Sequence, residues 1–520
     1  MKMVKSLILG SAAGLVAMSG AQAADLPVKA KAVEYVKICS LYGAGFYYIP
    51  GTDTCIKLSG YLRVDVLANA NSDDTPNTSS PASLGNRFTN AYTWRSREDL
   101  AIDTRTATEY GVVRTFMDLT FSWTDDSYTT SGTNALASVY SQIGALGAGQ
   151  ANNGTSGAVA NGTLGVYYAF IQFAGFTMGK AISPFSSSFI NYPGNNFDGL
   201  VGGGGTVTGV NQFVYTAQFG NGVSATIGVQ DPTQYYQAGI LNFGAVGAAN
   251  STGQNDYAGT VFPDIVANVD VTQAWGEAKL SVAAHDNNPA YYTNASSLAG
   301  HPNDVWGYAV QGALTINNIP TGVGDVINVQ GVYTNGATRY NIQDLAGAVG
   351  TWASYGGSGA AGTLGGFGLG VAPDAVFNTN GTLQLISTYG GRGGYTHNWN
   401  PYWSTSIYGA YAHVDYGSTT NASSAASIFC ASFLASQAAG GNAGGVTTCN
   451  PNYNITQAGI ISRWTPVKNL TFSADFTYEH LSSGMQGTVA LAASNAMPAG
   501  LYTLTNQNTY QVLFRAQRNW

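Results

Sequence analysis

Charged side chains are scarce in this chain of 520 residues, of which only 9% are Asp, Glu, Lys or Arg. An average soluble domain carries about 25% charged residues, so this chain has too few to cover a conventional water-facing surface. It also lacks an apolar run long enough to cross a membrane as a helix, and its mean hydropathy is near zero. With a formal net charge of −7 and no basic patch, the chain is not expected to bind nucleic acid.

Cysteine and histidine are also few, with four and five copies. The cysteines form two local pairs, Cys39 with Cys55 and Cys430 with Cys449, which suits an oxidising, exported compartment. Each disulfide would close a loop of about 15 to 20 residues and stabilise the fold by roughly 3 kcal/mol. Zinc is the rival interpretation, but neither pair has zinc-site spacing and no His lies close. We therefore expect no metal site and no cofactor.

Glycine, tyrosine and apolar residues are plentiful instead. The chain has 67 Gly and 32 Tyr, and 45% of its residues are hydrophobic, which argues against a disordered polymer. A charge-poor chain that is rich in Tyr and Gly and has no helical membrane signal is typical of an outer-membrane barrel. Lipid rather than water contacts much of the surface of such a barrel, so few charges are needed there.

The start of the chain has the pattern of a secretory signal peptide over residues 1–23. A basic beginning is followed by an apolar core over residues 7–18 and by an Ala-x-Ala cleavage site at residues 21–23. We expect residues 24–55 to form an N-terminal leader on the periplasmic side or in the lumen. Residues 56–520 are then expected to form the barrel, in the outer membrane of a bacterium.

Residues 94–123 are predicted to form a β-hairpin with one charged and one apolar face. Its polar face carries alternating charged residues: Arg95, Arg97, Asp99, Asp103, Arg105, Arg114 and Asp118. The opposite face carries Trp94, Leu100 and Phe121. A barrel with lipid outside and a charged aqueous lumen inside accounts for both faces. The alternative is an edge hairpin of a soluble β-protein, which Glu98 on the apolar face would favour.

The same alternation recurs along the chain, for example over residues 56–67, where Arg63 and Asp65 share the polar face. We count 16 candidate strands, with about 14 or 18 as alternatives; they begin near residues 56, 88, 107, 162, 175, 210, 222, 258, 275, 304, 325, 382, 403, 453, 469 and 508. Tight turns alternate with long Gly-, Ser-, Asn- and Ala-rich loops. This rhythm is typical of short periplasmic turns and long extracellular loops. The predicted fold is therefore all-β, a transmembrane antiparallel β-barrel.

The last strand ends in Trp520, and a terminal aromatic residue resembles the C-terminal signal that directs barrels to outer-membrane assembly. This strand must pair with the first one, because an open sheet edge does not persist in lipid.

Residues 24–66 closely resemble the opening of the alphaproteobacterial porins of rhizobia and their relatives. The shared pieces are VKICSLYGAGFYYIPGTDTCIK, RTATEYG and GFTMGKAISPF. This resemblance implies a 16-stranded barrel, usually trimeric, through which small hydrophilic solutes diffuse passively. It also implies a third extracellular loop that folds into the lumen, here over residues 184–209.

The resemblance further implies a constriction between wall arginines and that loop. The arginines that match the family's wall cluster are Arg63, Arg95, Arg97, Arg105 and Arg114. Asp198 is the only charged residue of the loop, which departs from relatives with several loop acids. Four wall acids could offset the arginines: Asp65, Asp99, Asp103 and Asp118. Alternatively, the arginines simply pair with these aspartates across strands.

A general diffusion porin is the function that these observations predict, surrounded by outer-membrane lipid and lipopolysaccharide and assembled as a homotrimer. The alternative is a substrate-selective outer-membrane channel, for example for sugars, which a row of lumenal aromatic residues would favour. A barrel enzyme would need a nucleophile and a base at its rim, and the histidines show no such motif. A structural or adhesive surface protein could use the long loops but would not require the arginines.

Overall fold

The computed structural model describes residues 37–69, 91–125, 128–129, 135–136, 158–159, 162–205, 207–244, 254–292, 298, 300–343, 351–355, 358–378, 381–492 and 498–520. The predicted signal peptide (residues 1–23) and the first part of the predicted leader lie outside the described residues, as does most of the loop predicted over residues 125–161. None of the helices among the described residues is long and apolar enough to cross a membrane.

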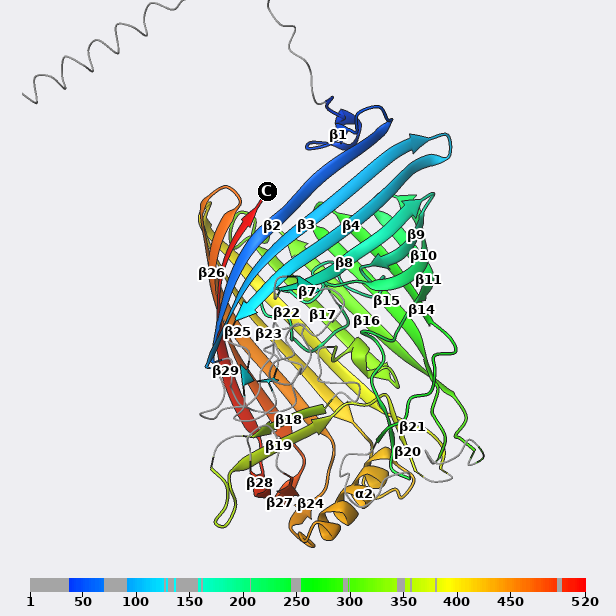
Figure 1. Ribbon diagram of the computed structural model, residues 1–520, viewed down its shortest axis with the longest axis vertical. Helices are drawn as coiled ribbons and strands as arrows, with labels where there is room; N and C mark the ends of the chain where they lie inside the picture. The colour runs from blue at the N-terminus through cyan, green and yellow to red at the C-terminus, as the bar shows by residue number, and fades with distance from the viewer. Residues whose placement is uncertain are drawn as a thin grey trace, which may run out of the picture.

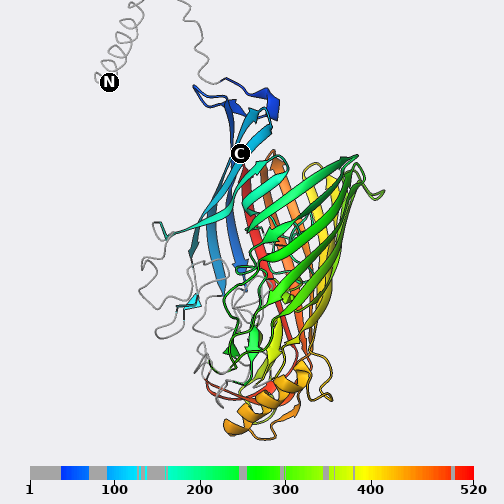
Figure 2. The same ribbon diagram turned by 90° about the vertical axis from the view of Figure 1, so that its right-hand side faces the viewer.

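Sixteen antiparallel strands close into a barrel (Figures 1 and 2). In order they are β2 (Thr54–Ala68), β3 (Tyr92–Thr108), β4 (Gly111–Asp125), β8 (Gly162–Phe173), β9 (Phe176–Ala181), β10 (Val210–Gly220), β11 (Val223–Gln230), β14 (Asp264–Gln273), β15 (Gly276–Asn287), β16 (Val305–Asn317), β17 (Val326–Asn335), β22 (Ser387–Asn400), β23 (Trp403–Asp415), β25 (Tyr453–Val467), β26 (Leu470–Ser483) and β29 (Gln507–Asn519). Each strand pairs with the next one, and β29 pairs with β2. The predicted fold class and strand count are confirmed.

Closure of the barrel brings the two ends of the sheet together. The register runs from Tyr61 opposite Asn519 to Ala68 opposite Val512. The main chains of Gly60 and Trp520 exchange two hydrogen bonds, with N···O distances of 3.1 and 3.3 Å. A Cβ atom at Gly60 would lie 1.9 Å from the carbonyl oxygen of Asp99, so only glycine fits here.

The two faces of the barrel wall differ in polarity as the alternation predicts. Large apolar side chains stay exposed on the outer face, among them Leu62, Trp94, Phe121, Leu280 and Phe514. The intervening residues of β3, including Arg95, Arg97 and Asp99, point inward and are buried. An exposed apolar outer wall is stable when lipid rather than water covers it.

Tight turns join the strands at one end of the barrel, which we call the turn end. They include residues 174–175, 221–222 and 468–469. Asn221 and Asn469 adopt the left-handed conformation, with φ of 51° and 66°, which Asn tolerates better than most residues. The C-terminus lies at this end (Figure 1).

A small knob formed by residues 37–53 projects from the turn end (Figure 1). It contains the 3-10 helix η1 (Ser40–Tyr42) and the short strand β1 (Tyr47–Tyr48), which pairs with β2. The predicted disulfide between Cys39 and Cys55 is present and buried. The guanidinium of Arg105 lies 5.0 Å from the ring centre of Phe46, so the knob rests on the barrel wall.

The opposite end, the loop end, carries a folded cap made from several loops (Figures 1 and 2). One sheet of the cap orders β18 (Thr351–Tyr355), β19 (Gly366–Val371), β28 (Gly500–Leu504), β27 (Gln486–Leu491) and β24 (Val446–Thr448). A second sheet orders β13 (Gln254–Asn255), β12 (Ile240–Asn242), β20 (Ala375–Phe377) and β21 (Gln384–Leu385). The pairings β12–β20 and β19–β28 are parallel, so they join loops that are far apart in the chain.

Besides β1 of the knob, three short strands lie outside this cap and the sixteen barrel strands. Strands β5 (Tyr128–Thr129) and β6 (Ala135–Leu136) pair with each other, and β7 (Ala158–Val159) pairs with β8. The link after β17 contains the 3-10 helix η3 (Thr338–Tyr340).

The helix of the cap, α2 (Ala425–Ala439), lies within the long loop predicted over residues 417–452. The Ser424 side chain caps it by accepting a hydrogen bond from the main-chain N–H of Ser427. Phe429 and Phe433, one turn apart, are 1% exposed and pack into the core of the cap. The predicted second disulfide, between Cys430 and Cys449, ties the helix to the chain that follows it.

Candidate functional site

Residues 182–209, between the fifth strand β9 and the sixth strand β10, run through the barrel interior along one wall; we call them the constriction loop. Wall side chains donate hydrogen bonds to its carbonyl groups, from Asn268 to Pro184 (2.7 Å), Gln311 to Phe185 (2.9 Å), Asn328 to Pro193 (2.9 Å), Arg463 to Gly194 (2.7 Å), Gln457 to Gly199 (3.0 Å) and Arg392 to Leu200 (2.9 Å). These donors come from β14, β16, β17, β22 and β25. The predicted fold of the third loop into the lumen is confirmed.

The loop also donates its own main-chain N–H groups to the wall. The N–H of Val201 donates to Gln457 at 2.9 Å, and the N–H of Asn196 donates to Asp475 at 2.6 Å. A buried loop needs such partners because orphaned main-chain groups are costly. Gly202, with φ of +90°, lets the loop approach the wall: a Cβ there would lie 2.3 Å from the carbonyl oxygen of Gly391.

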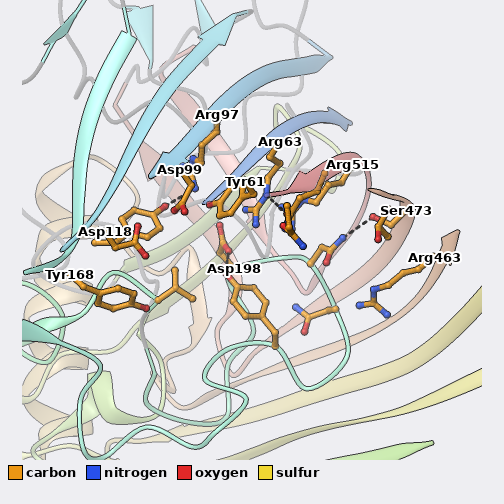
Figure 3. A pocket seen from close by; sticks show the side chains of 18 residues that line it. Tyr61, Arg63, Arg97, Asp99, Asp118, Tyr168, Asp198, Arg463, Ser473 and Arg515 are labelled. Atoms are coloured by element: carbon orange, nitrogen blue, oxygen red, sulfur yellow. Dashed lines mark hydrogen bonds between the residues drawn. The ribbon is translucent and has the colours of Figure 1, made fainter. Parts of the chain in front are cut away.

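The loop leaves a cavity of about 520 Å³ between itself and the wall that carries the barrel closure. Its lining includes Tyr61, Arg63, Arg97, Asp99, Asp118, Tyr167, Tyr168, Tyr192, Asn195, Asn196, Asp198, Arg463, Ser473, Arg515, Gln517 and Asn519. Figure 3 shows the wall side chains gathered around the loop residue Asp198. Five of the residues that the sequence assigned to the constriction and its wall acids therefore come together: Arg63, Arg97, Asp99, Asp118 and Asp198.

Three guanidinium groups of this cavity bind only neutral acceptors. Arg63 donates to Gln517 at 2.8 Å, and Arg97 donates to Ser122 at 2.8 Å and to the Tyr167 hydroxyl at 2.5 Å. Besides holding the loop carbonyl, Arg463 donates to Ser406 at 2.8 Å. Within the described residues none of these three arginines forms an ion pair, and all three line the cavity.

The carboxylate of Asp198, in the constriction loop, has a hydroxyl group as its hydrogen-bond donor. The Tyr192 hydroxyl donates a hydrogen bond to Asp198. Burial, and then the neighbouring Asp198 charge, raise the pKa of Tyr192 well above its ordinary value, so this hydroxyl stays protonated. Asp99 and Asp118 lie on neighbouring strands of the wall, β3 and β4, and line the same cavity.

The structure places the other predicted arginines elsewhere. Arg95 is 3% exposed and forms an ion pair with Asp65, which also accepts a hydrogen bond from Arg515 at 2.7 Å. Arg105 and Arg114 both pair with Asp103, at 3.0 Å each, closer to the turn end. For these arginines, cross-strand and same-strand pairing describes the geometry better than a role in the constriction does.

Sequence reasoning did not single out four lining residues: Arg463, Arg515, Tyr167 and Tyr168. Arg463 and Arg515 sit at inward positions of β25 and β29, on the same parity as Gln457 and Gln517, so strand alternation could have found both. No group of three or more His, Cys, Asp or Glu side chains among the described residues is placed to hold a metal ion.

Comparison with known proteins gives concordant matches. The model of the porin subfamily matches residues 25–511. Porin Omp2a of Brucella ovis is 33% identical over 314 residues, which are 58% of this chain and 82% of that protein. Porin Omp2b of Brucella neotomae is 31% identical over 358 residues, 68% of this chain and 80% of that protein. The solved outer membrane channel DcaP of Acinetobacter baumannii has the same fold, with a TM-score of 0.54 at 13% identity over 91% of this chain and 99% of that one.

Proposed function

Because this chain belongs to the porin subfamily and forms an outer-membrane channel for passive diffusion, we propose that its constriction favours small hydrophilic anions. The observation that carries the proposal is that Arg63, Arg97 and Arg463 line one cavity and have no carboxylate partner in the part of the chain that the structure describes. The turn end then faces the periplasm and the loop end faces the outside.

The charges that line the constriction cavity set its ion preference. Four arginines and three aspartates line the cavity. The lining therefore carries a formal excess of one positive charge. Arg515 shares its carboxylate partner Asp65 with Arg95, so these two arginines also keep one positive charge in excess. Unpaired cations next to a narrow aqueous path raise the local concentration of anions, and the loop sets the size limit.

The test is the reversal potential of the refolded protein in a planar bilayer with a KCl gradient. We expect the sign that marks chloride as the more permeant ion. Replacing Arg63, Arg97 and Arg463 together by Gln should move the potential toward cation preference. Arg518→Gln is the matched control, because Arg518 is exposed and donates to the turn residue Lys468 rather than lining the cavity. A cation-directed potential in the unaltered protein would overturn the proposal.

We also propose that three copies assemble through the outer face of β2 to β4. Glu98 points outward there, opposite Leu62 and Phe121 in the neighbouring strands, and it has no hydrogen bond or ion pair within the described part of the chain. It lies four residues from Trp94, about 13 Å along the strand, and thus inside an apolar band about 25 Å tall. A carboxylate at that depth is better accommodated against a second protein copy than against lipid.

Native mass spectrometry in detergent tests this assembly. A trimer mass for the unaltered protein and a loss of trimer on Glu98→Lys would support it. Leu280→Lys, on the outer face of β15, is the control that should leave the trimer intact. A monomer in every mild detergent would contradict the proposal.

We further propose that residues 1–23 are removed on export and that residues 24–55 form a periplasmic leader stapled by the Cys39–Cys55 disulfide. The intact mass of protein isolated from outer membranes tests this. It should correspond to a chain that begins at Ala24, and a mass that includes the first residues would contradict it.

A further inference from the structure

A second lumenal cavity, of about 460 Å³, lies between the root of the constriction loop and the turn end. Its lining comes from three parts of the barrel: β4, β8 and β9 on one side, the loop root at residues 182–184, and β10, β11, β14 and β15 further round the wall. Tyr168 lines both this cavity and the constriction cavity, so the two spaces adjoin. A solute that leaves the constriction toward the periplasm meets this second cavity next.

One side of the second cavity is an aromatic shelf, formed by Phe116, Tyr168 and Phe170. The ring centres of Phe116 and Phe170 are 5.4 Å apart and stacked, and those of Phe116 and Tyr168 are 6.2 Å apart. Phe116 points into the lumen, because Arg114 and Asp118 on either side of it in β4 do so too. The guanidinium of Arg114 lies 5.0 Å from the ring centre of Phe116 and 5.5 Å from that of Phe170, so it covers one side of the shelf, while both rings still line the cavity.

The loop root and β10 extend this apolar surface. Ile182, Pro184 and Val214 line the same cavity as the shelf. The partly exposed rings of the shelf and the exposed side chain of Ile182 favour a flat apolar body that displaces the water between them.

Lys279, on β15, supplies the only charge among the described residues that line this cavity. Its ammonium group has no hydrogen bond or ion pair within the described residues; Asp270 stands opposite Lys279 in the register of β14 with β15, Glu277 lies two residues before it in β15, and neither acid lines the cavity. Lys279 is several strands away from the shelf in the barrel order, so charge and rings face one space from different walls.

We propose that this cavity is a binding subsite for amphipathic organic anions, of which an aromatic monocarboxylate is the simplest. The carboxylate would meet Lys279 and the ring would lie on the aromatic shelf. A volume of about 460 Å³ falls within the range of small-molecule sites. An uncharged sugar fits less well, because it brings no negative charge to Lys279 and would place hydroxyl groups against Ile182, Pro184 and Val214.

This inference rests on the proposed function, since an anion reaches the second cavity only after passing Arg63, Arg97 and Arg463. The two cavities then act in series. The constriction selects for charge, and the aromatic shelf selects among anions for an apolar body. Benzoate should therefore dwell in the channel, whereas acetate should pass through it.

The experiment is single-channel recording in KCl with benzoate, acetate or benzamide added at the same concentration. Benzoate should interrupt the current transiently, whereas acetate lacks the ring and benzamide lacks the charge. Lys279→Gln should weaken the benzoate effect by about tenfold, the equivalent of about 1.4 kcal/mol, and Lys279→Arg should preserve it. Phe116→Leu combined with Phe170→Leu should weaken it too, and Phe121→Leu, on the outer face of the same strand, should not.

The outcomes separate the two proposals. Equal interruption by benzoate and acetate, or an unchanged benzoate effect in Lys279→Gln, overturns the subsite. An open channel with anion preference and no benzoate interruption overturns the subsite and leaves the anion-selective constriction standing. A cation-directed reversal potential rejects the proposed selectivity of the constriction, whatever benzoate does. The open-channel current of each variant reports whether it has folded.

Discussion

The hydroxyl group of Tyr192 donates a hydrogen bond to the carboxylate of Asp198, and both residues belong to the constriction loop. Asp198 is the only acid in that loop, and Figure 3 shows it directed toward the wall that carries Tyr61 and Arg63. The bond keeps the single loop charge in a fixed place, from which it opposes the wall arginines.

Replacing Asp198 by Asn should therefore increase anion preference. A unit charge at about 4 Å in water is worth about 1 kcal/mol, so we expect the permeability ratio of chloride to potassium to rise by a few-fold. Reversal potentials measured in a KCl gradient give this ratio. Tyr192→Phe keeps the charge and is the control, with a smaller change expected. An unchanged ratio in Asp198→Asn would mean that the loop acid does not act on passing ions.

Replacing Gln457 by Leu should loosen the constriction loop. The side-chain amide of Gln457 donates to Gly199 at 3.0 Å and accepts from Val201 at 2.9 Å, and it also donates to Glu479 at 2.5 Å. Leu would remove all three hydrogen bonds from this buried site, at a cost of about 1–3 kcal/mol for each group left without a partner. We expect a noisier open-channel current and a lower thermal midpoint. Gln273→Leu, at the exposed turn end, should change neither, and a quiet Gln457→Leu channel would contradict the anchoring role.

Opening the Cys430–Cys449 disulfide should loosen the cap without closing the channel. The two cysteines are 19 residues apart, and a loop of that size is stabilised by about 3 kcal/mol in the chain-entropy model. A double Ser variant should be cut by protease within residues 440–449 on intact cells, while its conductance stays normal. The same substitution at Cys39 and Cys55 is the control, because that disulfide lies at the other end. Equal protease resistance in both variants would argue against the prediction.

Asp325 should make stability depend on pH in the acidic range. This buried carboxylate precedes β17 and accepts hydrogen bonds from the main chain of Asn398 (2.8 Å) and from the side chains of His397 (2.7 Å), Thr321 (2.7 Å) and Tyr395 (3.0 Å). Burial alone would raise its pKa, but these donors outweigh burial, and the pKa lies well below its ordinary value.

A depressed pKa stabilises the folded state above the unfolded pKa of about 4, and this stability is lost as the pH falls through the folded pKa. Asp325→Asn should therefore lower the thermal midpoint at neutral pH, and the gap to the unaltered protein should shrink as the pH falls below about 4. Asp53→Asn, at an exposed position of the knob, should leave the midpoint unchanged at every pH. A gap that is constant with pH would refute the assignment.

Replacing Trp520 by Ala should reduce assembly into the outer membrane. The main chain of Trp520 pairs with Gly60 at the barrel closure, and its ring lies against the same glycine. We expect less folded protein in the outer-membrane fraction and more protease-sensitive protein in the periplasm, as followed by heat-modifiable migration on gels. Arg518→Gln, two residues earlier, should assemble normally, and normal assembly of Trp520→Ala would count against a terminal signal.

Strand alternation predicted most of the fold, because the face of the wall on which a residue lies depends only on its position in its own strand. It could not give the position of each side chain along the channel. Arg95 and Arg97 share a face of β3, yet only Arg97 lines the constriction, since Arg95 lies opposite Asp65 in the register with β2. That register is a property of two strands together.

The cap at the loop end could not be predicted from the sequence, because its strands pair over long distances in the chain. Its parallel pairings join residues 240–242 with residues 375–377 and residues 366–367 with residues 503–504. Such contacts have no local pattern in the chain. Helix α2 is rich in Ala and Ser and has no charged residue, so it resembled the low-complexity loops around it.

The constriction loop is held mainly through its main chain, by amide and guanidinium groups of the wall that bind its carbonyls. Main-chain groups are the same whatever the amino acid, so the loop residues whose side chains are not buried can be exchanged without releasing the loop from the wall. Natural substitutions in the loop can thus change the selectivity of the channel one residue at a time, while the barrel stays the same. For an engineer, the same loop is a place to graft new filters into an existing barrel.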